Sequence, residues 1–408
     1  MSNYTPKLRF KKFTDEWQEK KLGDIGDVVT GNTPTTVDLT LYGGEFNFVS
    51  PADINEGRYI GQTKTRLSKK GFDKTRKIPA DSTLFVCIGS TIGKIAQTKE
   101  EVATNQQINA IVANRNIDKD FLYFGLSRIA SKIALLAGNQ AVPIINKTDF
   151  SRNKIFMPTV QEQEKIAEFL TAVDEKIGKL GEKKKGFEKY KKSAMQAMFS
   201  QKIRFRDFSG SDFPDWEEKK LGEIGATYNG LTSKSAEDFG EGEPYITYMQ
   251  IFGGSSIDMS KCRKVKVGEK ENQNEVKVGD IFFTTSSETP EEAGFSSVLL
   301  NNDGVAYLNS FCFGYRLGDA ANYLPVYLNI FFRSDDFRKK VIRLAQGSTR
   351  FNLSKIEMMK IKIQIPVAEE QEKIAEFLTS LDNKINLINN QLEQAKLFKK
   401  SLLKRMFA

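Results

Sequence analysis

Histidine is absent from this sequence of 408 residues. Without it the chain cannot build a Ser-His-Asp triad, a histidine-ligated metal centre or a histidine general base, although carboxylate and lysine chemistry stay open. Cysteine is scarce, and Cys87, Cys262 and Cys312 lie far apart with no Cys-x-x-Cys pair among them. This spacing indicates neither a disulfide framework nor a zinc site, so we expect buried free thiols.

Long apolar runs are also missing. No segment approaches the roughly 20 apolar residues of a membrane span, and the first ten residues, MSNYTPKLRF, lack the apolar core of a signal peptide. We therefore expect a soluble, cytoplasmic protein without membrane contact. Because 39% of the residues are apolar and 11% aromatic, the chain is predicted to fold into two or three domains with proper cores.

Catalytic motifs are not found either. Residues 89–94 (GSTIGK) are one residue short of a phosphate-binding loop, and Ile95 stands where magnesium binding needs Ser or Thr, so a turn between strands is predicted. No amino-methyltransferase motif and no glycine-rich adenosylmethionine loop is present. Four residues of the types used by metal-dependent nucleases are too close together to lie on neighbouring strands: Pro214, Asp215, Glu218 and Lys220. The sequence predicts a chain without catalytic activity.

What the sequence does contain is an internal duplication. The octapeptide QEKIAEFL occurs at residues 163–170 and again at 371–378, and WQEKKLGDIG at 17–26 recurs as WEEKKLGEIG at 216–225. The first pair is 208 positions apart and the second 199, so about nine more residues lie between the markers in the second copy. Such a repeat predicts two related halves with a pseudo-twofold relationship.

The material between the markers differs in its polar residues. Residues 46–54 and 245–251 are alike only as apolar, strand-like runs, which indicates one scaffold with two different recognition surfaces. Each half is predicted to be a mixed α/β domain of about 150 residues. The expected strands are 83–88, 108–112, 280–285, 296–300 and 306–315, and the expected helices are 120–137 and 323–345.

Each octapeptide begins a stretch with coiled-coil spacing, and Pro158 and Pro366 stand just ahead of the two predicted helices of roughly 30 residues. Lys184 interrupts the first stretch, and three glycines, Gly178, Gly181 and Gly186, weaken it by about 1 kcal/mol each relative to alanine. We interpret Lys183, Lys185, Lys191 and Lys192 as a solvated face. The apolar seam comprises Leu170, Val173, Ile177, Leu180, Phe187, Ala194 and Met198, and then Leu378, Leu381, Ile385, Ile388, Leu392, Ala395, Leu402 and Met406.

The connectivity predicts how these helices run. If they pair, the second must return toward the first domain, so the pair is an antiparallel coiled coil. At about 1.5 Å per residue, the stretch from Leu170 to Met198 is roughly 43 Å long, which spaces two domains by rather more than one turn of B-form DNA. Because the domains differ in sequence, two unlike half-sites are expected.

Positive charge is in excess, with a net charge of +9 and a pI near 9.1, which points to a nucleic acid partner or, alternatively, to a surplus for solubility. Two basic segments in matching positions suggest phosphate contacts, solvated loops being the alternative. They are Lys64, Arg66, Lys69, Lys70, Lys74, Arg76 and Lys77, opposed only by Asp73, and Lys261, Arg263, Lys264, Lys266 and Lys270.

Short polar side chains in candidate loops suit base reading, although ordinary turns have the same composition. The candidates are Ser90, Thr91, Asn139, Gln140, Ser286, Ser287, Thr349 and Arg350.

The layout of Trp-x-x-x-x-Leu-Gly-x-Ile-Gly, a variable α/β unit, Pro, Gln-Glu-x-Ile-Ala and a long helix, repeated once, closely resembles the DNA specificity subunit of Type I restriction-modification systems. The resemblance covers essentially the whole chain and rests on Trp17, Leu22, Gly23, Gly26, Gln163, Ile166 and Ala167 with Trp216, Leu221, Gly222, Gly225, Gln371, Ile374 and Ala375. It implies target recognition domains at 1–158 and 201–366, and helical repeats for spacing and partner docking at 159–200 and 367–408.

This resemblance implies a non-catalytic subunit that reads a bipartite, asymmetric sequence in double-stranded DNA. It further implies two modification subunits, which methylate adenine with S-adenosylmethionine, and two restriction subunits, which add ATP- and magnesium-dependent translocation and cleavage. Those cofactors belong to the partners, and none is expected in this chain. Base contacts do not carry over, because members of the family differ most inside the recognition domains. The alternative is a coiled-coil scaffold that assembles partners without reading DNA.

Overall fold

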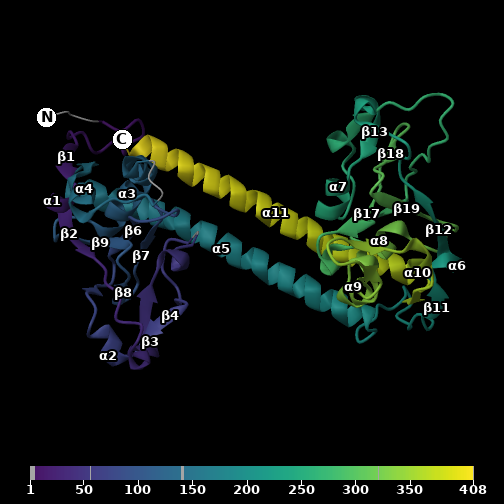
Figure 1. Cartoon of the computed structure of the whole chain (residues 1–408), viewed down its shortest axis with the longest axis horizontal. Helices are drawn as coiled ribbons and strands as arrows, with labels where there is room; N and C mark the ends of the chain where they lie inside the picture. Colours follow the sequence, from purple (N-terminus) through teal and green to yellow (C-terminus); the bar gives the residue numbers. More distant parts are fainter. Residues whose placement is uncertain (1–4, 56, 139–141, 320, 408) are drawn as a thin grey trace. The chain divides into compact units, whose positions relative to one another are not determined.

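The computed structural model describes residues 5–55, 57–138, 142–319 and 321–407 (Figure 1). The chain forms two compact units, Met1–Lys183 with Ile388–Ala408, hereafter unit 1, and Lys184–Leu387, hereafter unit 2. Each unit combines a mixed α/β part with one section of each of two long helices, α5 (Val160–Phe199) and α11 (Ala368–Met406). The predicted duplication is therefore present as two separately packed bodies.

Unit 1 contains two four-stranded sheets, one antiparallel with the order β2-β9-β6-β7 and one mixed with the order β4-β3-β8-β5, in which β3 and β8 are parallel. A further antiparallel pair joins β1 to β10. The strands are β1 (Gln18–Lys21), β2 (Gly26–Thr30), β3 (Tyr42–Val49), β4 (Thr65–Leu67), β5 (Lys77–Ile78), β6 (Thr83–Val86), β7 (Ile95–Gln97), β8 (Val102–Thr104), β9 (Ile108–Ala113) and β10 (Lys154–Met157). The helices are α1 (Leu22–Ile25), α2 (Lys69–Phe72), α3 (Lys119–Ala134) and α4 (Lys147–Arg152), with short 3-10 turns at Leu39–Leu41, Pro51–Asp53 and Leu135–Ala137.

Unit 2 repeats this plan with the sheet β12-β19-β15-β17 in place of β2-β9-β6-β7 and the pair β11-β22 in place of β1-β10. The sheet β14-β13-β18 corresponds to β4-β3-β8, since β13 pairs antiparallel with β14 and parallel with β18, and the sheet β16-β21-β20 is an addition. The strands are β11 (Glu217–Lys220), β12 (Gly225–Asn229), β13 (Phe239–Ile246), β14 (Arg263–Val265), β15 (Ile281–Thr284), β16 (Ser286–Ser287), β17 (Ser296–Val298), β18 (Tyr307–Leu308), β19 (Cys312–Leu317), β20 (Ala345–Gln346), β21 (Phe351–Leu353) and β22 (Lys362–Ile365). The helices are α6 (Leu221–Ile224), α7 (Tyr248–Gly253), α8 (Pro325–Phe332), α9 (Asp335–Ile342) and α10 (Lys355–Met359), with 3-10 turns η4 (Ala236–Asp238), η5 (Met259–Lys261) and η6 (Pro290–Glu292).

Local capping divides several runs that the sequence pattern joins. Residues 306–315 form two strands, β18 and β19, because the Asn309 side chain accepts the Phe311 amide proton at 2.9 Å and closes a turn. Residues 323–345 form α8 and α9 rather than one helix, since Ser334 caps a new helix by accepting from the Phe337 amide. The run 245–251 leaves β13 and enters α7, so its second part is helical rather than extended.

The cores of both units include the long helices. In unit 1, Trp17 packs edge-to-face on Phe121 and Phe407, and the same cluster holds Ile166 and Leu170 of α5. In unit 2 the corresponding cluster combines Trp216 with Met198 and Phe199 of α5 and with Ile374, Ala375 and Leu378 of α11. The apolar side chains of the repeated octapeptide are thus interior packing residues.

The helices are longer than predicted, at 40 residues for α5 and 39 for α11, and they run antiparallel within each unit. Asp174 pairs with Lys399 at 2.6 Å in unit 1, and Lys191 pairs with Asp382 in unit 2. The predicted seam is buried or half-buried throughout: Leu170, Leu378, Leu381, Ile388, Leu392, Leu402 and Met406 are buried, and Val173, Ile177, Leu180 and Ile385 are partly covered. The antiparallel coiled coil is confirmed.

Two further sequence expectations can be compared with the structure. All three cysteines are free, with Cys87 and Cys312 buried and Cys262 half-buried, and burial raises the pKa of Cys87 to about 12. Within the described ranges, no helix is both long and apolar enough to cross a membrane.

The glycine at the end of the repeated segment WQEKKLGDIG is needed for a steric reason. A Cβ added to Gly26 would lie 2.5 Å from the Val112 carbonyl oxygen, and one added to Gly225 would lie 2.5 Å from that of Arg316. In both units this glycine lets the first strand of the sheet approach its neighbour. The repeat therefore preserves a close contact between backbones.

Gly26→Ala is expected to destabilise unit 1 by about 1 to 3 kcal/mol, because the strand must move to accept the methyl group. Gly178→Ala, in the same unit, is expected to stabilise it by about 1 kcal/mol, since nothing lies within 4 Å of the added Cβ and alanine favours the helix. Urea unfolding followed by tryptophan fluorescence measures both changes. Equal effects of the two substitutions would contradict the steric explanation.

Candidate nucleic-acid interface

In unit 2 the structure brings together candidate residues that lie far apart in the sequence. Strand β16 pairs with β21, with Ser286 opposite Asn352 and Ser287 opposite Phe351. Arg350 stands just before β21 on the exposed turn from β20. Ser286, Ser287 and Arg350 consequently line a single cavity of about 430 Å³. Thr349 is exposed on the same turn and is not part of the lining.

The remaining lining of this cavity was not predicted. It consists of Tyr248, Met249, Phe252, Phe311, Glu288 and Glu292. The aromatic members come from α7 and from the turn before β19, and local patterns in the sequence give no sign that these segments meet. We call this set, with Ser286, Ser287 and Arg350, the aromatic-carboxylate cavity.

The matching place in unit 1 is the connection between β6 and β7. Ile88 bridges to Ile144, and the Gly89 amide donates to the Pro143 carbonyl at 3.0 Å. Ser90 is exposed on this connection and Thr91 is half-buried, so residues 89–94 form a strand connection rather than a phosphate loop. The candidates Asn139 and Gln140 lie outside the described residues.

The basic segment of unit 1 is partly engaged by the protein itself. Lys69 and Lys77 pair with Asp73 at 3.0 and 2.9 Å and hold the pKa of that carboxyl below its usual range, and Lys70 pairs with Asp38 at 3.3 Å. Asp73 is thus not the only opposing acid. Other cations bond to backbone carbonyls, Arg76 to Thr30 at 2.7 Å and Arg66 to Glu45, while the Lys64 side chain is exposed and its amide donates to Asp53 at 2.9 Å.

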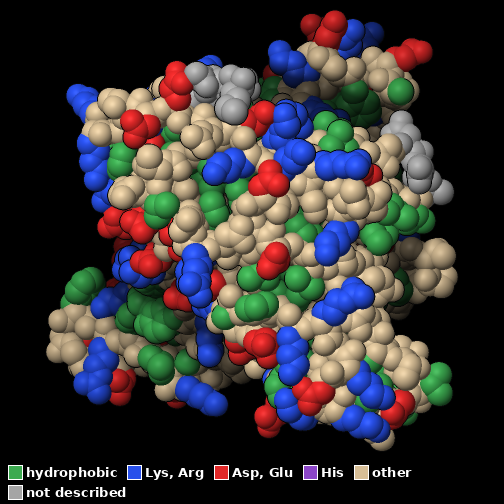
Figure 2. Space-filling view, turned by 90° about the vertical axis from the view of Figure 1, so that its left-hand side faces the viewer, with side chains coloured by type: hydrophobic (Ala, Val, Ile, Leu, Met, Phe, Trp, Pro, Cys, Tyr) green, Lys and Arg blue, Asp and Glu red, His purple; other side chains and the backbone are tan. Residues whose placement is uncertain are grey.

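The basic segment of unit 2 is less constrained. Lys261 pairs with Asp258 at 2.8 Å and lowers the pKa of that carboxyl to about 2, whereas Arg263 and Lys264 are exposed on β14. Strand β14 pairs with β13, and the chain continues from β13 into α7, which supplies Tyr248, Met249 and Phe252 to the cavity lining. Figure 2 is drawn from the side of unit 1, and on this face Lys and Arg side chains are interspersed with Asp and Glu rather than gathered into one patch.

The start of each long helix is tied to its own unit by buried polar residues. Gln163 accepts from the Asp118 amide at 2.9 Å and donates to the Pro158 carbonyl at 2.9 Å. Gln371 makes the equivalent bonds, accepting from the Leu324 amide at 2.9 Å and donating to the Pro366 carbonyl at 2.8 Å. The first residue of the repeated octapeptide thus joins the helix to the α/β part of each unit.

Next to each of these glutamines lies an ion pair that the sequence patterns did not predict. Arg9 meets the fully buried Glu162 through two contacts of 2.7 Å, and Arg204 meets the fully buried Glu370 at 3.1 and 2.7 Å. Trp216 also donates its indole N–H to Glu370 at 3.0 Å. The shared Arg-Phe at residues 9–10 and 204–205 was the available signal, since it too is duplicated.

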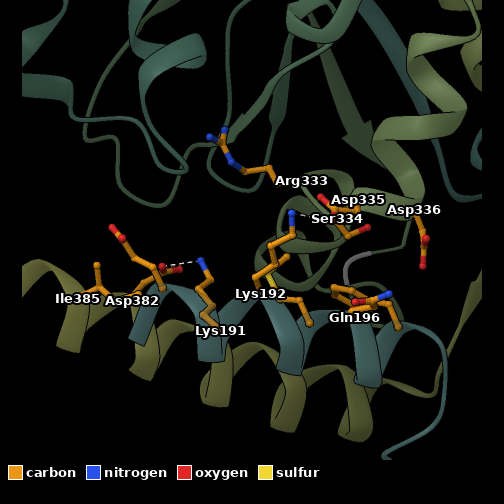
Figure 3. Close-up of a pocket in the computed structure, with 12 residues that line it drawn as sticks. Lys191, Lys192, Gln196, Arg333, Ser334, Asp335, Asp336, Asp382 and Ile385 are labelled. Carbon is orange, nitrogen blue, oxygen red and sulfur yellow. Dashed lines mark hydrogen bonds and ion pairs between the residues drawn. The ribbon is translucent and has the colours of Figure 1, made fainter. Parts of the chain in front are cut away.

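A second cavity of unit 2, of about 370 Å³, lies where α5 and α11 meet the turn between α8 and α9 (Figure 3). Lys192 pairs there with Asp335 at 3.1 Å, and Lys191 pairs with Asp382. Lys192 is 71% exposed, as expected for a solvated face, whereas Lys191 is only 24% exposed, so the interpretation as a solvated face was wrong for Lys191 alone. Arg333 donates to the Gly254 carbonyl at 3.0 Å, and burial lowers the pKa of its guanidinium.

Comparison with known proteins agrees with this duplicated architecture. Residues 14–186 and 214–397 each match the family described as Type I restriction modification DNA specificity domain. The chain belongs to this family. Both matches begin shortly before the tryptophan that precedes β1 or β11 and extend into the long helix, so each specificity domain includes part of the coiled coil.

Individual relatives of these specificity domains resemble the chain over most of its length. The MjaIX specificity subunit of Methanocaldococcus jannaschii is 25% identical over 73% of this chain and 72% of its own length, and the MjaVIII specificity subunit of the same organism is 23% identical over 95% and 91%. The crystal structure of a Type I system S subunit from M. genitalium has the same fold, with a TM-score of 0.61, 18% identity and 99% coverage of both chains.

Proposed function

We propose that this chain is the subunit that selects the DNA sequence for a Type I restriction-modification complex. The observation that carries the proposal is the pair of specificity domains with one shared scaffold and two unlike surfaces. The connection from β15 to β17 contains Ser286, Ser287, Glu288 and Glu292, whereas that from β6 to β7 contains no acidic residue. Two different surfaces on a duplicated frame suit two unlike half-sites in double-stranded DNA.

The proposed role is recognition without catalysis. Two modification subunits dock on the helical repeats and methylate adenine with S-adenosylmethionine, and two restriction subunits add ATP- and magnesium-dependent cleavage. The similar packing of α5 and α11 in the two units supports this stoichiometry, because similar surfaces can receive identical partners. Residues such as Arg263 and Lys264 would contact phosphates and fix the register on DNA without reading its sequence.

Expression with the modification subunit in a host that lacks this system tests the proposal. Methylome sequencing is expected to show one new adenine-methylated motif with two unlike half-sites separated by a fixed gap. The purified complex should also bind DNA with an affinity that falls steeply with salt, as counterion release requires. Assembly with the modification subunit but no methylated motif and no DNA binding would instead favour a coiled-coil scaffold.

A further inference from the structure

The aromatic-carboxylate cavity of unit 2 presents large apolar side chains to solvent. Phe311 is 59% exposed and Met249 is 67% exposed. Behind them Tyr248 and Phe252 stack with ring centroids 6.1 Å apart, and Phe252 meets Phe295 edge-to-face at 5.3 Å. Apolar side chains left exposed together at a polar cavity mark binding surfaces, because they lower the free energy only when a ligand covers them.

Two carboxylates face the same cavity. Glu288 is exposed and Glu292 is half-buried, and neither makes an ion pair with any residue that the structure describes. The pKa of the nearby Tyr248 is raised first by burial, then by Cys312, and to a smaller extent by Glu292 and Glu288. Uncompensated negative charge is notable in a chain of net charge +9, because it opposes approach of a phosphate backbone.

The carboxylates stand on a loop that is held firmly. Arg338 donates to three carbonyl oxygens of this loop, those of Glu291 at 2.8 Å, Ala293 at 2.6 Å and Gly294 at 2.7 Å. Its buried guanidinium also lies 4.6 Å from the centroid of the Phe295 ring. Across the cavity, the Tyr248 hydroxyl donates to the Ser286 carbonyl at 2.8 Å. The backbone next to Glu292 is therefore held in place, so binding of a ligand would need little ordering of this part of the loop.

The hydrogen-bonding pattern of DNA bases decides which ligand suits this arrangement. A carboxylate only accepts hydrogen bonds, so it is repelled by the acceptors of guanine (N7, O6) and thymine (O4) in the major groove. Adenine offers an amino group beside an N7 acceptor, whereas cytosine offers its N4 amino group alone. The guanine paired with that cytosine needs a donor, and Arg350, on the same cavity, is one.

We propose that the aromatic-carboxylate cavity reads a cytosine of a C·G pair in the half-site bound by unit 2. Glu288 and Glu292 accept from the cytosine N4 amino group, Arg350 donates to the paired guanine, and Phe311 and Met249 cover the apolar edges. This inference rests on the proposed function. The connection at 87–94 in unit 1 has no acid and ends in Lys94, so the other half-site is read by different chemistry.

The test uses the full chain in complex with its modification subunit. The double variant Glu288→Gln/Glu292→Gln is compared with wild type, and Glu291→Gln is the matched control, because Glu291 is an exposed neighbour that does not line the cavity. The double variant is expected to lose roughly tenfold or more of its discrimination at one C·G position of one half-site. Its affinity for unrelated DNA should rise, since two charges that repel phosphates are removed, whereas misfolding would lower that affinity.

Methylome sequencing separates the outcomes. A wild-type motif without a C·G pair in the half-site assigned to unit 2, or a double variant with an unchanged motif, would overturn the cytosine assignment while the specificity function stood. Relaxation at the same position by Glu291→Gln would also overturn it. If the wild-type complex methylates no bipartite motif, the proposed function itself fails, and the inference fails with it. Exchange of residues 26–158 with those of another specificity subunit identifies which half-site belongs to unit 2.

Discussion

Glu370→Ala is expected to destabilise unit 2 by about 3 kcal/mol, because it leaves two donors of that unit without their shared acceptor. The Glu370 side chain is fully buried and accepts from the guanidinium of Arg204 and from the indole N–H of Trp216. The Arg204 side chain is 21% exposed, so water can solvate part of its charge once Glu370 is gone. This places the expected loss at the lower end of the range for breaking a buried ion pair.

Unit 1 supplies the matched control. Glu162→Ala removes an equally buried carboxylate from Arg9, but the indole N–H of Trp17 has no hydrogen-bond partner among the described residues. The Arg9 side chain is 10% exposed, less than that of Arg204, so water solvates its charge less well once the carboxylate is removed. This difference alone would make the loss of stability larger in unit 1. A hydrogen bond to a charged group contributes about 1.5 to 3 kcal/mol. We expect the loss of the Trp216 bond to Glu370 to have a larger effect than the small difference in exposure between the two arginines. The loss in unit 1 should be the smaller.

The chain has two tryptophans, one in each unit, so urea unfolding can report on each unit separately. Trp17→Phe leaves the fluorescence of Trp216 as the signal for unit 2, and Trp216→Phe leaves that of Trp17 for unit 1. Glu370→Ala is therefore made in the Trp17→Phe background, which keeps Trp216. Glu162→Ala is made in the Trp216→Phe background, which keeps Trp17. Equal losses in the two units would show that the bond from Trp216 adds no stability.

The architecture could be predicted because its signals are local or repeated. QEKIAEFL and the apolar spacing after it are properties of one segment, and they located both helices; the order of domains and helices along the chain then predicted the antiparallel pairing. Polar interiors could not be predicted in this way. Glu162 and Glu370 resemble ordinary acids in a first helical turn, since their arginine partners lie 153 and 166 residues away in the chain. Only tertiary packing shows that both are buried.

The candidate site shows the same division. Ser286 and Arg350 were proposed separately as members of polar loops, and the pairing of β16 with β21 places them on one cavity. Tyr248 was expected in an extended run, and its place in α7 became evident only with the fold. Burial of Gln163 and Gln371 also changes the meaning of the repeat. The two octapeptides are identical partly because each one attaches a long helix to the α/β part of its unit, in addition to any surface that they offer to partners.

Insertion of one heptad into both long helices is expected to lengthen the gap between half-sites by about three base pairs and to leave the half-sites themselves unchanged. Helix α5 continues without a break from unit 1 into unit 2, and α11 returns from unit 2 into unit 1. Seven residues add about 10 Å of helix at 1.5 Å per residue, and one base pair of DNA rises about 3.4 Å.

The points between residues 183 and 184 and between 387 and 388 suit the insertion, because there each helix passes from one unit to the other. The inserted residues should repeat the apolar spacing of Leu170, Val173 and Ile177, so that the seam keeps its phase. Methylome sequencing with the modification subunit then reads the gap directly. Insertion into α5 alone lengthens only one of the two helical connections, and we expect it to abolish methylation of both the original and the lengthened motif. An unchanged gap in the double insertion would mean that something other than helix length sets the spacing, because neither recognition surface has been altered.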